Sequence, residues 1–185
     1  EATGTCPCCA LRYAFIPGLT EKEVSLTAYH RYLDIPVRAA FHCNDELLNQ
    51  IWKVSEHTFR LCSGLFFLDG IKRDRWIWSG DAYQSILVNE YLMADPDINR
   101  RTLLALRGNE HMTTHINTIV DYSLLWLLGV YAHYQAYDDA VFVKQIYRKI
   151  RALMDFCTGQ LDEHGFLIGR EGDWIFIDWT DFDKE

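Results

Sequence analysis

The residues best suited to chemistry lie together in residues 69–81, which read Asp-Gly-Ile-Lys-Arg-Asp-Arg-Trp-Ile-Trp-Ser-Gly-Asp. This stretch holds three carboxylates, three basic side chains and two tryptophans. Glycines near both ends permit tight or left-handed turns of the backbone. Charged groups interleaved with large aromatic rings supply hydrogen-bonding partners and flat apolar walls, which a site for a small polar ligand requires.

The carboxylates of Asp69, Asp74 and Asp81 are candidates for proton transfer. A carboxylic acid beside indole rings and away from water has a raised pKa, so it can stay protonated and act as a general acid. Arg73 and Arg75 act in the opposite direction, because a nearby positive charge favours the ionised form. The alternative interpretation is a set of solvated ion pairs with half-buried tryptophans, an arrangement that is common in proteins.

Two geometries can bring these groups together. In a helix, Asp74, Trp78 and Asp81 would share one face, because they are spaced by four and three residues. In a tightly folded loop they would converge through the turns that the two glycines permit. Ser79 is a good N-cap for a helix that begins at about residue 80, so the stretch leads into a helix in either case.

Residues 69–81 resemble the signature of bacterial α-L-rhamnosidases of the six-hairpin glycosidase group, roughly Asp-Cys-Pro-x-Arg-Glu/Asp-x-x-x-Trp-x-Gly-Asp. The sequence departs from this signature at Gly70-Ile71, where the family has Cys-Pro, and at Asp74, which is often Glu. The resemblance implies that Asp74 is the general acid and that Trp78 packs on the sugar. It further implies that hydroxyl groups of rhamnose are bound by Asp69, Arg73 and Asp81.

A second acidic and aromatic stretch, residues 172–181, contains Asp-Trp twice. It could form a strand pair, a loop over the site, or part of the core. It resembles a Gly-Asp-Trp segment that lines the rhamnose pocket of the family. The tripeptide Gly-Asp-Trp itself favours Asp173 and Trp174 as the sugar-binding residues. The longer pattern Phe-Ile-Asp-Trp-x-x-x-Asp-Lys favours Asp178 and Trp179, so both pairs stay candidates. Asp121-Tyr122 resembles a family loop that faces the pocket.

The resemblance implies an inverting glycoside hydrolase that releases terminal α-L-rhamnose from rhamnosides. In such enzymes one acid protonates the departing oxygen and a second carboxylate activates a water molecule. The family places this second carboxylate, a Glu, at a position after the last residue of this sequence. We therefore expect a fragment that carries the general-acid side of the site and is inactive, or nearly so, by itself.

Capping residues and apolar periodicity predict five helices at about residues 44–62, 81–93, 95–107, 121–137 and 138–158. Helix, short loop, helix is the pattern of αα-hairpins. The prediction is a mainly α fold in which residues 42–185 form the incomplete N-terminal part of an (α/α)6 toroid, as the resemblance implies. Asn44 is the expected cap of the first helix, and the fourth helix, nearly apolar all round, is expected to be buried.

Residues 1–41 show strand patterns at 10–16 and 23–30. Two strands do not make a stable sheet alone, so we assign 1–41 to the last strands of a β-domain and a linker. The resemblance agrees, because α-L-rhamnosidases carry a β-sandwich before the helical domain. The chain starts with Glu and ends just after an aromatic stretch, so we expect a piece of a longer protein. Its expected partners are a rhamnose-containing substrate and the remainder of its own barrel.

The composition limits the other possible partners. Apolar residues make up 49% of the chain, enough for a sizeable core, and 14% are aromatic, as in many sugar-binding proteins. A net charge of −8 without a long basic run argues against nucleic acid and anionic membrane surfaces. No apolar run is long enough to cross a membrane.

Cys43, Cys62 and Cys157 stand singly in apolar surroundings and are best explained as small core residues. Cys6 and Cys9 have the spacing of a metal-binding pair, but no further ligands follow at similar spacing. His111 and His115 are best explained as residues of an exposed loop. We therefore expect no metal and no cofactor. A periplasmic or secreted location is favoured over a cytoplasmic one, although the cysteines do not decide the compartment.

Two other functions stay open at this point. The first is another (α/α)6 glycosidase, related to trehalases or glucuronyl hydrolases, which also use paired carboxylates and aromatic subsites. The second is a non-catalytic helical module that binds carbohydrate or another partner, in which residues 69–81 form a surface loop.

Overall fold

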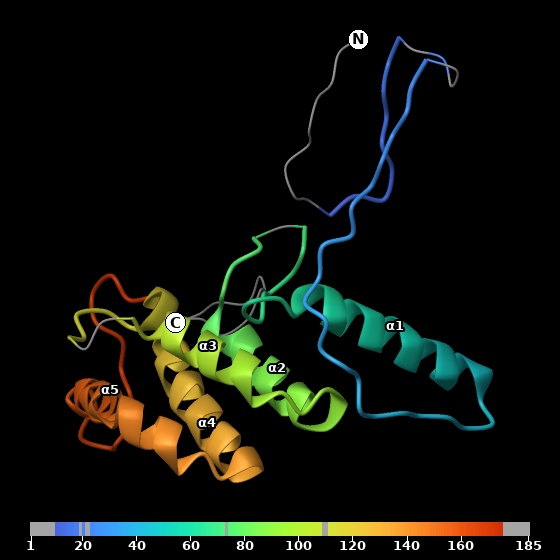
Figure 1. Cartoon of the computed structure of the whole chain (residues 1–185). Helices are drawn as coiled ribbons and strands as arrows, with labels where there is room; N and C mark the ends of the chain where they lie inside the picture. Colours follow the sequence, from blue (N-terminus) through green and yellow to red (C-terminus); the bar gives the residue numbers. More distant parts are fainter. Residues whose placement is uncertain (1–9, 19, 21–22, 73, 109–110, 176–185) are drawn as a thin grey trace.

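The computed structural model describes residues 10–18, 20, 23–72, 74–108 and 111–175. Within these ranges the chain forms five α-helices and one 3-10 turn (Figure 1). Their bounds are α1 Glu46–Cys62, α2 Ser79–Leu92, α3 Pro96–Leu106, η1 Ile116–Thr118, α4 Val120–Tyr137 and α5 Ala140–Thr158. The mainly α prediction is therefore confirmed, and each expected helix is present.

The helices α2 and α3 form one αα-hairpin, and α4 and α5 form a second. In the first hairpin the side chain of Asp95 caps α3 by accepting hydrogen bonds from the N–H groups of Asp97 and Ile98. In the second, Asp139 caps α5 by accepting from the N–H of Phe142. An Asp before a helix satisfies N–H groups that have no partner within the helix. The sequence favours Asp95 as the first cap and leaves Asp138 and Asp139 as alternatives for the second.

The helices α2 and α4 run parallel to each other. Near their N-termini, the Ser79 hydroxyl donates to the Tyr122 carbonyl at 2.7 Å. Near their C-termini, Asn89 Nδ2 lies 3.4 Å from the Tyr137 hydroxyl. Gly129 allows this close packing in the middle of α4, since a Cβ there would lie 3.3 Å from Ile86 Cδ1. One end of the hairpin pair therefore gathers the N-termini of both helices.

One face of α4 forms the centre of the core. Buried residues recur at helical spacing as Ser123, Trp126, Val130 and His133. The Trp126 indole N–H donates to the Leu103 carbonyl of α3 at 2.9 Å, so this large ring is both buried and hydrogen-bonded. The opposite face of α4 is exposed at Leu124, Leu128 and Tyr131. The prediction of a fully buried helix is therefore wrong for the described residues, none of which covers that face.

Most residues of the first helix, α1, are exposed. Its N-cap is Asp45, which accepts hydrogen bonds from the Leu47 and Leu48 N–H groups, and not Asn44. Leu47, Leu48 and Ile51 belong to the apolar stripe of this helix and are exposed. Partly buried Trp52 and Phe59 make its contacts with the core.

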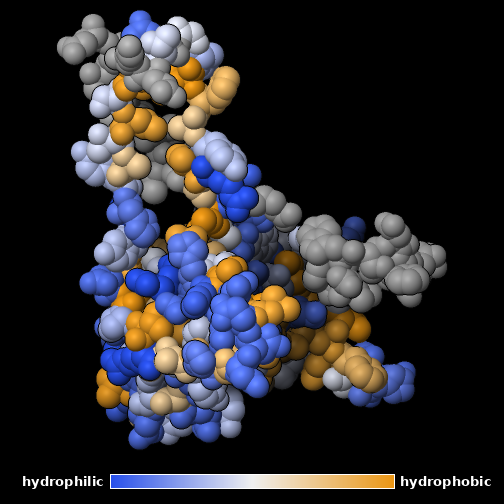
Figure 2. Space-filling view, turned by 90° about the vertical axis from the view of Figure 1, so that its right-hand side faces the viewer, coloured by the Kyte–Doolittle hydropathy of each residue, from blue (hydrophilic) through white to orange (hydrophobic). Residues whose placement is uncertain are grey.

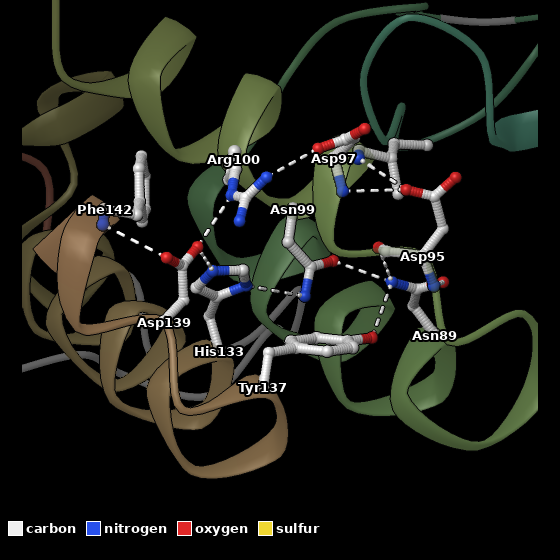
Figure 3. Close-up of polar contacts among 10 residues, drawn as sticks. Asn89, Asp95, Asp97, Asn99, Arg100, His133, Tyr137, Asp139 and Phe142 are labelled. Atoms are coloured by element: carbon white, nitrogen blue, oxygen red, sulfur yellow. Dashed lines mark hydrogen bonds and ion pairs between the residues drawn. The ribbon is translucent and has the colours of Figure 1, made fainter.

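At the far end of α2 and α4 from their N-termini lies a buried polar network (Figure 3). Asn89 Nδ2 donates to Oδ1 of Asn99 at 2.9 Å, and Asn99 Nδ2 lies 3.4 Å from His133 Nδ1. His133 Nε2 lies 3.0 Å from Asp139 Oδ2, which also accepts from Arg100 Nε at 2.6 Å. Burial lowers the pKa of His133, and a neutral ring that donates from Nε2 and accepts at Nδ1 fits both contacts.

The described part of residues 10–41 contains no β-ladder. This segment projects from the helices, and most of its side chains are exposed (Figures 1 and 2). It joins the helical body through Arg38, whose N–H donates to the Leu92 carbonyl at 2.8 Å. The strands expected at 10–16 and 23–30 do not form here, because strand N–H and C=O groups need a neighbouring strand and no described segment supplies one. The assignment of 1–41 to a separate β-domain stays a prediction.

Figure 2 shows the side of the molecule on which α1 lies. Apolar and charged residues are interspersed on that surface. None of the helices among the described residues is sufficiently long and apolar to span a membrane.

Candidate active site

A closed loop holds the candidate general acid. The Trp76 N–H donates to Asp69 Oδ1 at 2.9 Å, and the Asp69 N–H donates to the Trp76 carbonyl at 3.1 Å. These two hydrogen bonds join the ends of the segment 69–76. Asp74 lies within this segment and is exposed. The loop thus presents Asp74 to solvent close to the start of α2.

The segment before this loop is fixed to α3. The Phe67 N–H donates to the Thr102 hydroxyl at 3.0 Å, and Arg101 Nε donates to the Leu65 carbonyl at 2.8 Å. Phe67 is buried and packs against Phe59 of α1, with ring centroids 5.6 Å apart. The loop that carries Asp74 therefore starts from a well-anchored position.

Trp78 directly precedes α2 and is held through its neighbours. Asn117 Nδ2 donates to the Ile77 carbonyl at 3.1 Å, and Asn117 Oδ1 accepts from the Ser79 N–H at 2.9 Å. The Trp78 indole N–H is buried, and no described residue accepts a hydrogen bond from it. The position of this ring therefore depends on packing and on the backbone at residues 77 and 79.

Tyr122, at the start of α4, packs against this corner. Its ring meets that of Trp78 edge to face, with centroids 6.3 Å apart. A Cβ at Gly80 would lie only 2.7 Å from Tyr122 Cε1, so a residue with a side chain does not fit at position 80 while the ring stays in place. The Gly-Asp that closes the 69–81 stretch is thus explained by close packing of α2 against Tyr122.

The Asp81 carboxylate responds to burial and to the two other carboxylates of the stretch. Partial burial raises the pKa of Asp81, and the negative charges of Asp69 and Asp74 raise it further against the lowering effect of its own backbone N–H. Burial also raises the pKa of Tyr122, and Asp81 and Asp121 add to this effect. At the first turns of α2 and α4, burial and neighbouring negative charges thus raise the pKa of both Asp81 and Tyr122.

The segment containing Asp173 and Trp174 docks next to the same corner. The Trp174 N–H donates to the Thr118 carbonyl at 2.9 Å, and the Trp174 carbonyl accepts from the Val120 N–H at 3.2 Å. The Asp173 side chain is only 6% exposed, and Arg170 Nε donates to it at 3.1 Å. His115 Nε2 lies 3.8 Å from the same carboxylate.

The structure thus brings together most of the residues expected from the sequence. Asp69, Asp74, Trp78 and Asp81 lie in or directly after the closed loop, and Trp174 is joined to the neighbouring turn. The Asp173 carboxylate is occupied by Arg170, which points to a role in holding its own loop. Arg73, Asp178 and Trp179 lie outside the described residues.

Of the two geometries considered for residues 74–81, the loop is correct. The helix begins only at Ser79, so Asp74 and Trp78 precede it and do not share a helical face with Asp81. Ser79 is also not the N-cap: it is the first helical residue, and its hydroxyl bonds to Tyr122.

Sequence reasoning missed two residues. Asn117 gave no local signal, because its partners lie some forty residues earlier in the chain. His115 was expected in an exposed loop but is buried, with Nδ1 2.9 Å from the Ser123 hydroxyl and its ring against Phe156. Among the described residues, no group of three or more His, Cys, Asp or Glu side chains is arranged to hold a metal ion.

The fold and the site together define a domain of helical hairpins with carboxylates and tryptophans at the end where α2 and α4 begin. The sequence profile of the bacterial alpha-L-rhamnosidase six-hairpin glycosidase domain matches residues 37–185, and the chain belongs to this family. The mainly α, six-hairpin assignment is thereby confirmed.

Two solved structures are similar to the chain. One is a rhamnosidase from Klebsiella oxytoca with rhamnose bound, with a TM-score of 0.67 and 26% identity over 80% of this chain. The other is a GH78 family rhamnosidase of Bacillus sp. GL1, with a TM-score of 0.67 and 25% identity over 80% of this chain. The matched region covers 32% of the first protein and 17% of the second. A search of proteins with curated functions gives no match.

Proposed function

We propose that this chain carries the general-acid side of the active site of an inverting α-L-rhamnosidase. The main support is the closed loop 69–76, which holds Asp74 near Asp69 and Asp81 at the start of α2. Membership of the six-hairpin rhamnosidase family and similarity to a structure with bound rhamnose favour a terminal α-L-rhamnoside as the substrate.

In this proposal Asp74 donates a proton to the departing glycosidic oxygen. Asp69 Oδ1 closes the loop, and the same carboxylate accepts a hydrogen bond from a sugar hydroxyl. Asp81, with its raised pKa, binds another hydroxyl and holds a proton to higher pH than an ordinary aspartate. Trp78 and Trp174 supply apolar surface for the ring and its methyl group, and Arg73 a further hydrogen-bond donor.

Inversion requires a second carboxylate that activates water on the opposite face of the sugar. The two carboxyl groups stand roughly 6.5–9.5 Å apart in inverting enzymes, which leaves room for that water. We propose that this base comes from a part of the whole protein that follows residues 1–185, since the chain matches only a third or less of each similar rhamnosidase. The remaining hairpins of the barrel are then the partner of this chain.

Release of rhamnose from an alkyl α-L-rhamnoside, whose leaving oxygen must be protonated as the bond breaks, tests the proposal in the longest natural protein that contains this sequence. Asp74→Asn should lower kcat about 100-fold or more, the usual cost of losing a general acid. Asp155→Asn is the matched control, because Asp155 is an exposed surface residue of α5. Equal activity of Asp74→Asn and the parent would exclude Asp74 as the acid.

The same assay separates the alternatives. Hydrolysis of glycosides of other sugars without hydrolysis of the rhamnoside would favour another (α/α)6 glycosidase. Binding of a glycoside without its hydrolysis would favour a non-catalytic module. We expect no turnover by residues 1–185 alone. Turnover by this piece would mean that the base lies within it, with Asp173, Asp178 or Asp181 as candidates.

A further inference from the structure

The short turn that precedes α4 has an unusual backbone. Asn117 has φ 53° and Thr118 has φ 64°, so two successive residues other than glycine adopt the left-handed conformation. Asn tolerates this conformation, but a β-branched residue such as Thr rarely adopts it. Such strain persists only where the surroundings fix the backbone, and it clusters at functional sites.

Surrounding hydrogen bonds hold this turn in place. The Thr118 N–H donates to the His115 carbonyl at 2.9 Å, and the Ile119 N–H donates to the Ile116 carbonyl at 3.2 Å. The buried Ser123 hydroxyl accepts from the Ile116 N–H at 3.1 Å and lies 2.9 Å from His115 Nδ1. The turn is thus tied to the first residues of α4 by side chains that are themselves buried.

The turn has one tryptophan-bearing segment on each side. On one side, both ends of the Asn117 amide bind the backbone that flanks Trp78, at the Ile77 carbonyl and the Ser79 N–H. On the other side, the Thr118 carbonyl accepts the Trp174 N–H at 2.9 Å. Two adjacent residues therefore connect segments that lie almost a hundred positions apart in the sequence.

We propose that Asn117 is a positioning residue, whose amide sets the place of Trp78 relative to Trp174 and thus the width of the sugar-binding corner. This inference rests on the proposed function, because it treats both rings as walls of the rhamnoside site. The side chain of Asn117 fits this task because it donates and accepts at once and tolerates the left-handed backbone. Trp78 depends on it, because no described residue binds its indole N–H.

Two substitutions separate the amide from the backbone conformation. Asn117→Gly keeps the left-handed backbone accessible and removes both hydrogen bonds. Asn117→Asp keeps the oxygen that accepts from the Ser79 N–H and loses the donor to Ile77. Asn49→Ala is the matched control. The Asn49 amide also accepts from a backbone N–H and donates to a backbone carbonyl, both of Cys43. These bonds lie at the start of α1 and do not involve the segments that carry Trp78 and Trp174.

In the longest natural protein containing this sequence, Asn117→Gly should lower kcat/KM for an aryl α-L-rhamnoside at least 10-fold, with most of the change in KM. A small displacement of binding groups suffices for an effect of this size. Hydrogen exchange in a peptide spanning residues 77–82 should become at least 10-fold faster at the Ser79 amide. Asn117→Asp should give a smaller change in both, and Asn49→Ala should leave both within twofold of the parent.

The outcomes are distinct. Exchange at Ser79 that stays as slow in Asn117→Gly as in the parent would overturn the positioning role, whether or not the protein is a rhamnosidase. Faster exchange with unchanged kcat/KM would also overturn it, because the rings would then not depend on the amide for binding. A parent protein without rhamnosidase activity would reject the proposed function, and the exchange comparison would still decide whether Asn117 holds the Trp78 backbone.

Discussion

At the residue scale, the buried Asp139 carboxylate joins three helices of the described core. It accepts hydrogen bonds from Arg100 Nε, from His133 Nε2 and from the Phe142 N–H. Burial alone would raise its pKa, but these three donors together lower it to about 2. The group therefore links α3, α4 and the cap of α5 through one ionised side chain.

Replacing this carboxylate with an amide should destabilise the domain. Asp139→Asn keeps the shape but loses the charge that pairs with Arg100, and it cannot accept at both oxygens. Removing one partner of a buried pair costs about 3–5 kcal/mol, and we expect the lower end because Arg100 is partly exposed. The midpoint of urea unfolding measures this change. Asp97→Asn, which affects an exposed ion pair with the same arginine, should cost less than about 1 kcal/mol.

The depressed pKa of Asp139 also predicts acid sensitivity. The ionised form is favoured in the folded state, so its stabilising contribution is complete above pH 4 and is lost as the pH falls from about 4 to about 2. This contribution amounts to at most about 2.5 kcal/mol, since the pKa falls from 3.8 to about 2 and a shift of one pKa unit corresponds to about 1.4 kcal/mol. Unfolding free energies of the parent should therefore fall more steeply than those of Asp139→Asn over this range. Parallel pH profiles would contradict the assignment.

At the scale of elements, the contact between the start of α2 and Tyr122 decides how the site is built. Gly80 lies in the first turn of α2, where alanine would ordinarily favour the helix by up to about 1 kcal/mol. Here the added Cβ would lie 2.7 Å from Tyr122 Cε1 and 2.9 Å from its Cζ. Overpacking of this kind costs typically about 1–3 kcal/mol.

Gly80→Ala should therefore lower the melting temperature and displace the Tyr122 ring. Gly64→Ala is the control, because a Cβ at Gly64 meets no atom within 4 Å. The penalty should disappear in a Tyr122→Ala background, where the double-mutant cycle would show coupling between the two positions. Equal melting temperatures of Gly80→Ala and Gly64→Ala in the Tyr122 background would contradict the close packing described above.

The sequence predicts the elements best where the signals are local. Asp95-Pro96 identifies the start of α3, and the pair Asp138-Asp139 identifies the start of α5 to within one residue, because a cap acts on N–H groups two or three residues away. Prediction from the sequence fails where the burial of a residue depends on contacts with residues that are distant in the sequence. The apolar stripe of α1 is correct in its periodicity, yet which residues of that stripe become buried depends on what packs against them.

The same division holds for the candidate site. The spacing within residues 69–81 reveals the carboxylates and Trp78, because these residues are close in sequence. Asn117 and the burial of His115 depend on contacts with Ser79, Ser123 and Asp173, and no local pattern encodes them. The hydrogen bond by which Asp69 closes the loop could not be predicted either. The sequence does not show whether an aspartate accepts a backbone N–H or is exposed to solvent.

At the scale of the whole molecule, much apolar surface is not covered by the described residues. On α1, Leu47 is 64% exposed and Val54 is 65% exposed, and the two lie on one helical face. Between α1 and α2 an apolar groove of about 270 Å³ is lined by Trp52, Phe59 and Tyr91, among others. Large apolar patches mark interaction sites or aggregation liabilities.

The chain of residues 1–185, studied alone, should consequently self-associate and bind a hydrophobic dye such as ANS. Leu47→Lys combined with Val54→Lys should reduce both effects, because it places charges on the exposed face of α1. Size-exclusion chromatography and dye fluorescence measure the change, and an exposed polar pair such as Arg151→Lys with Asp155→Glu serves as control. A monomeric parent that melts in a single two-state transition would contradict this prediction.

Because α2 and α4 are parallel, the candidate site residues lie at one end of both helices and the buried polar network lies at the other. The sugar-facing candidates lie at the N-terminal ends, and the Asn89, Asn99 and His133 network lies near the C-terminal ends. Ten residues of helix, about 15 Å, lie between Ser79 and Asn89, and substitutions that far apart usually have additive effects. In evolutionary terms, the N-terminal ends of α2 and α4 can therefore vary in sequence while the polar network at the opposite end keeps the fold above its stability threshold.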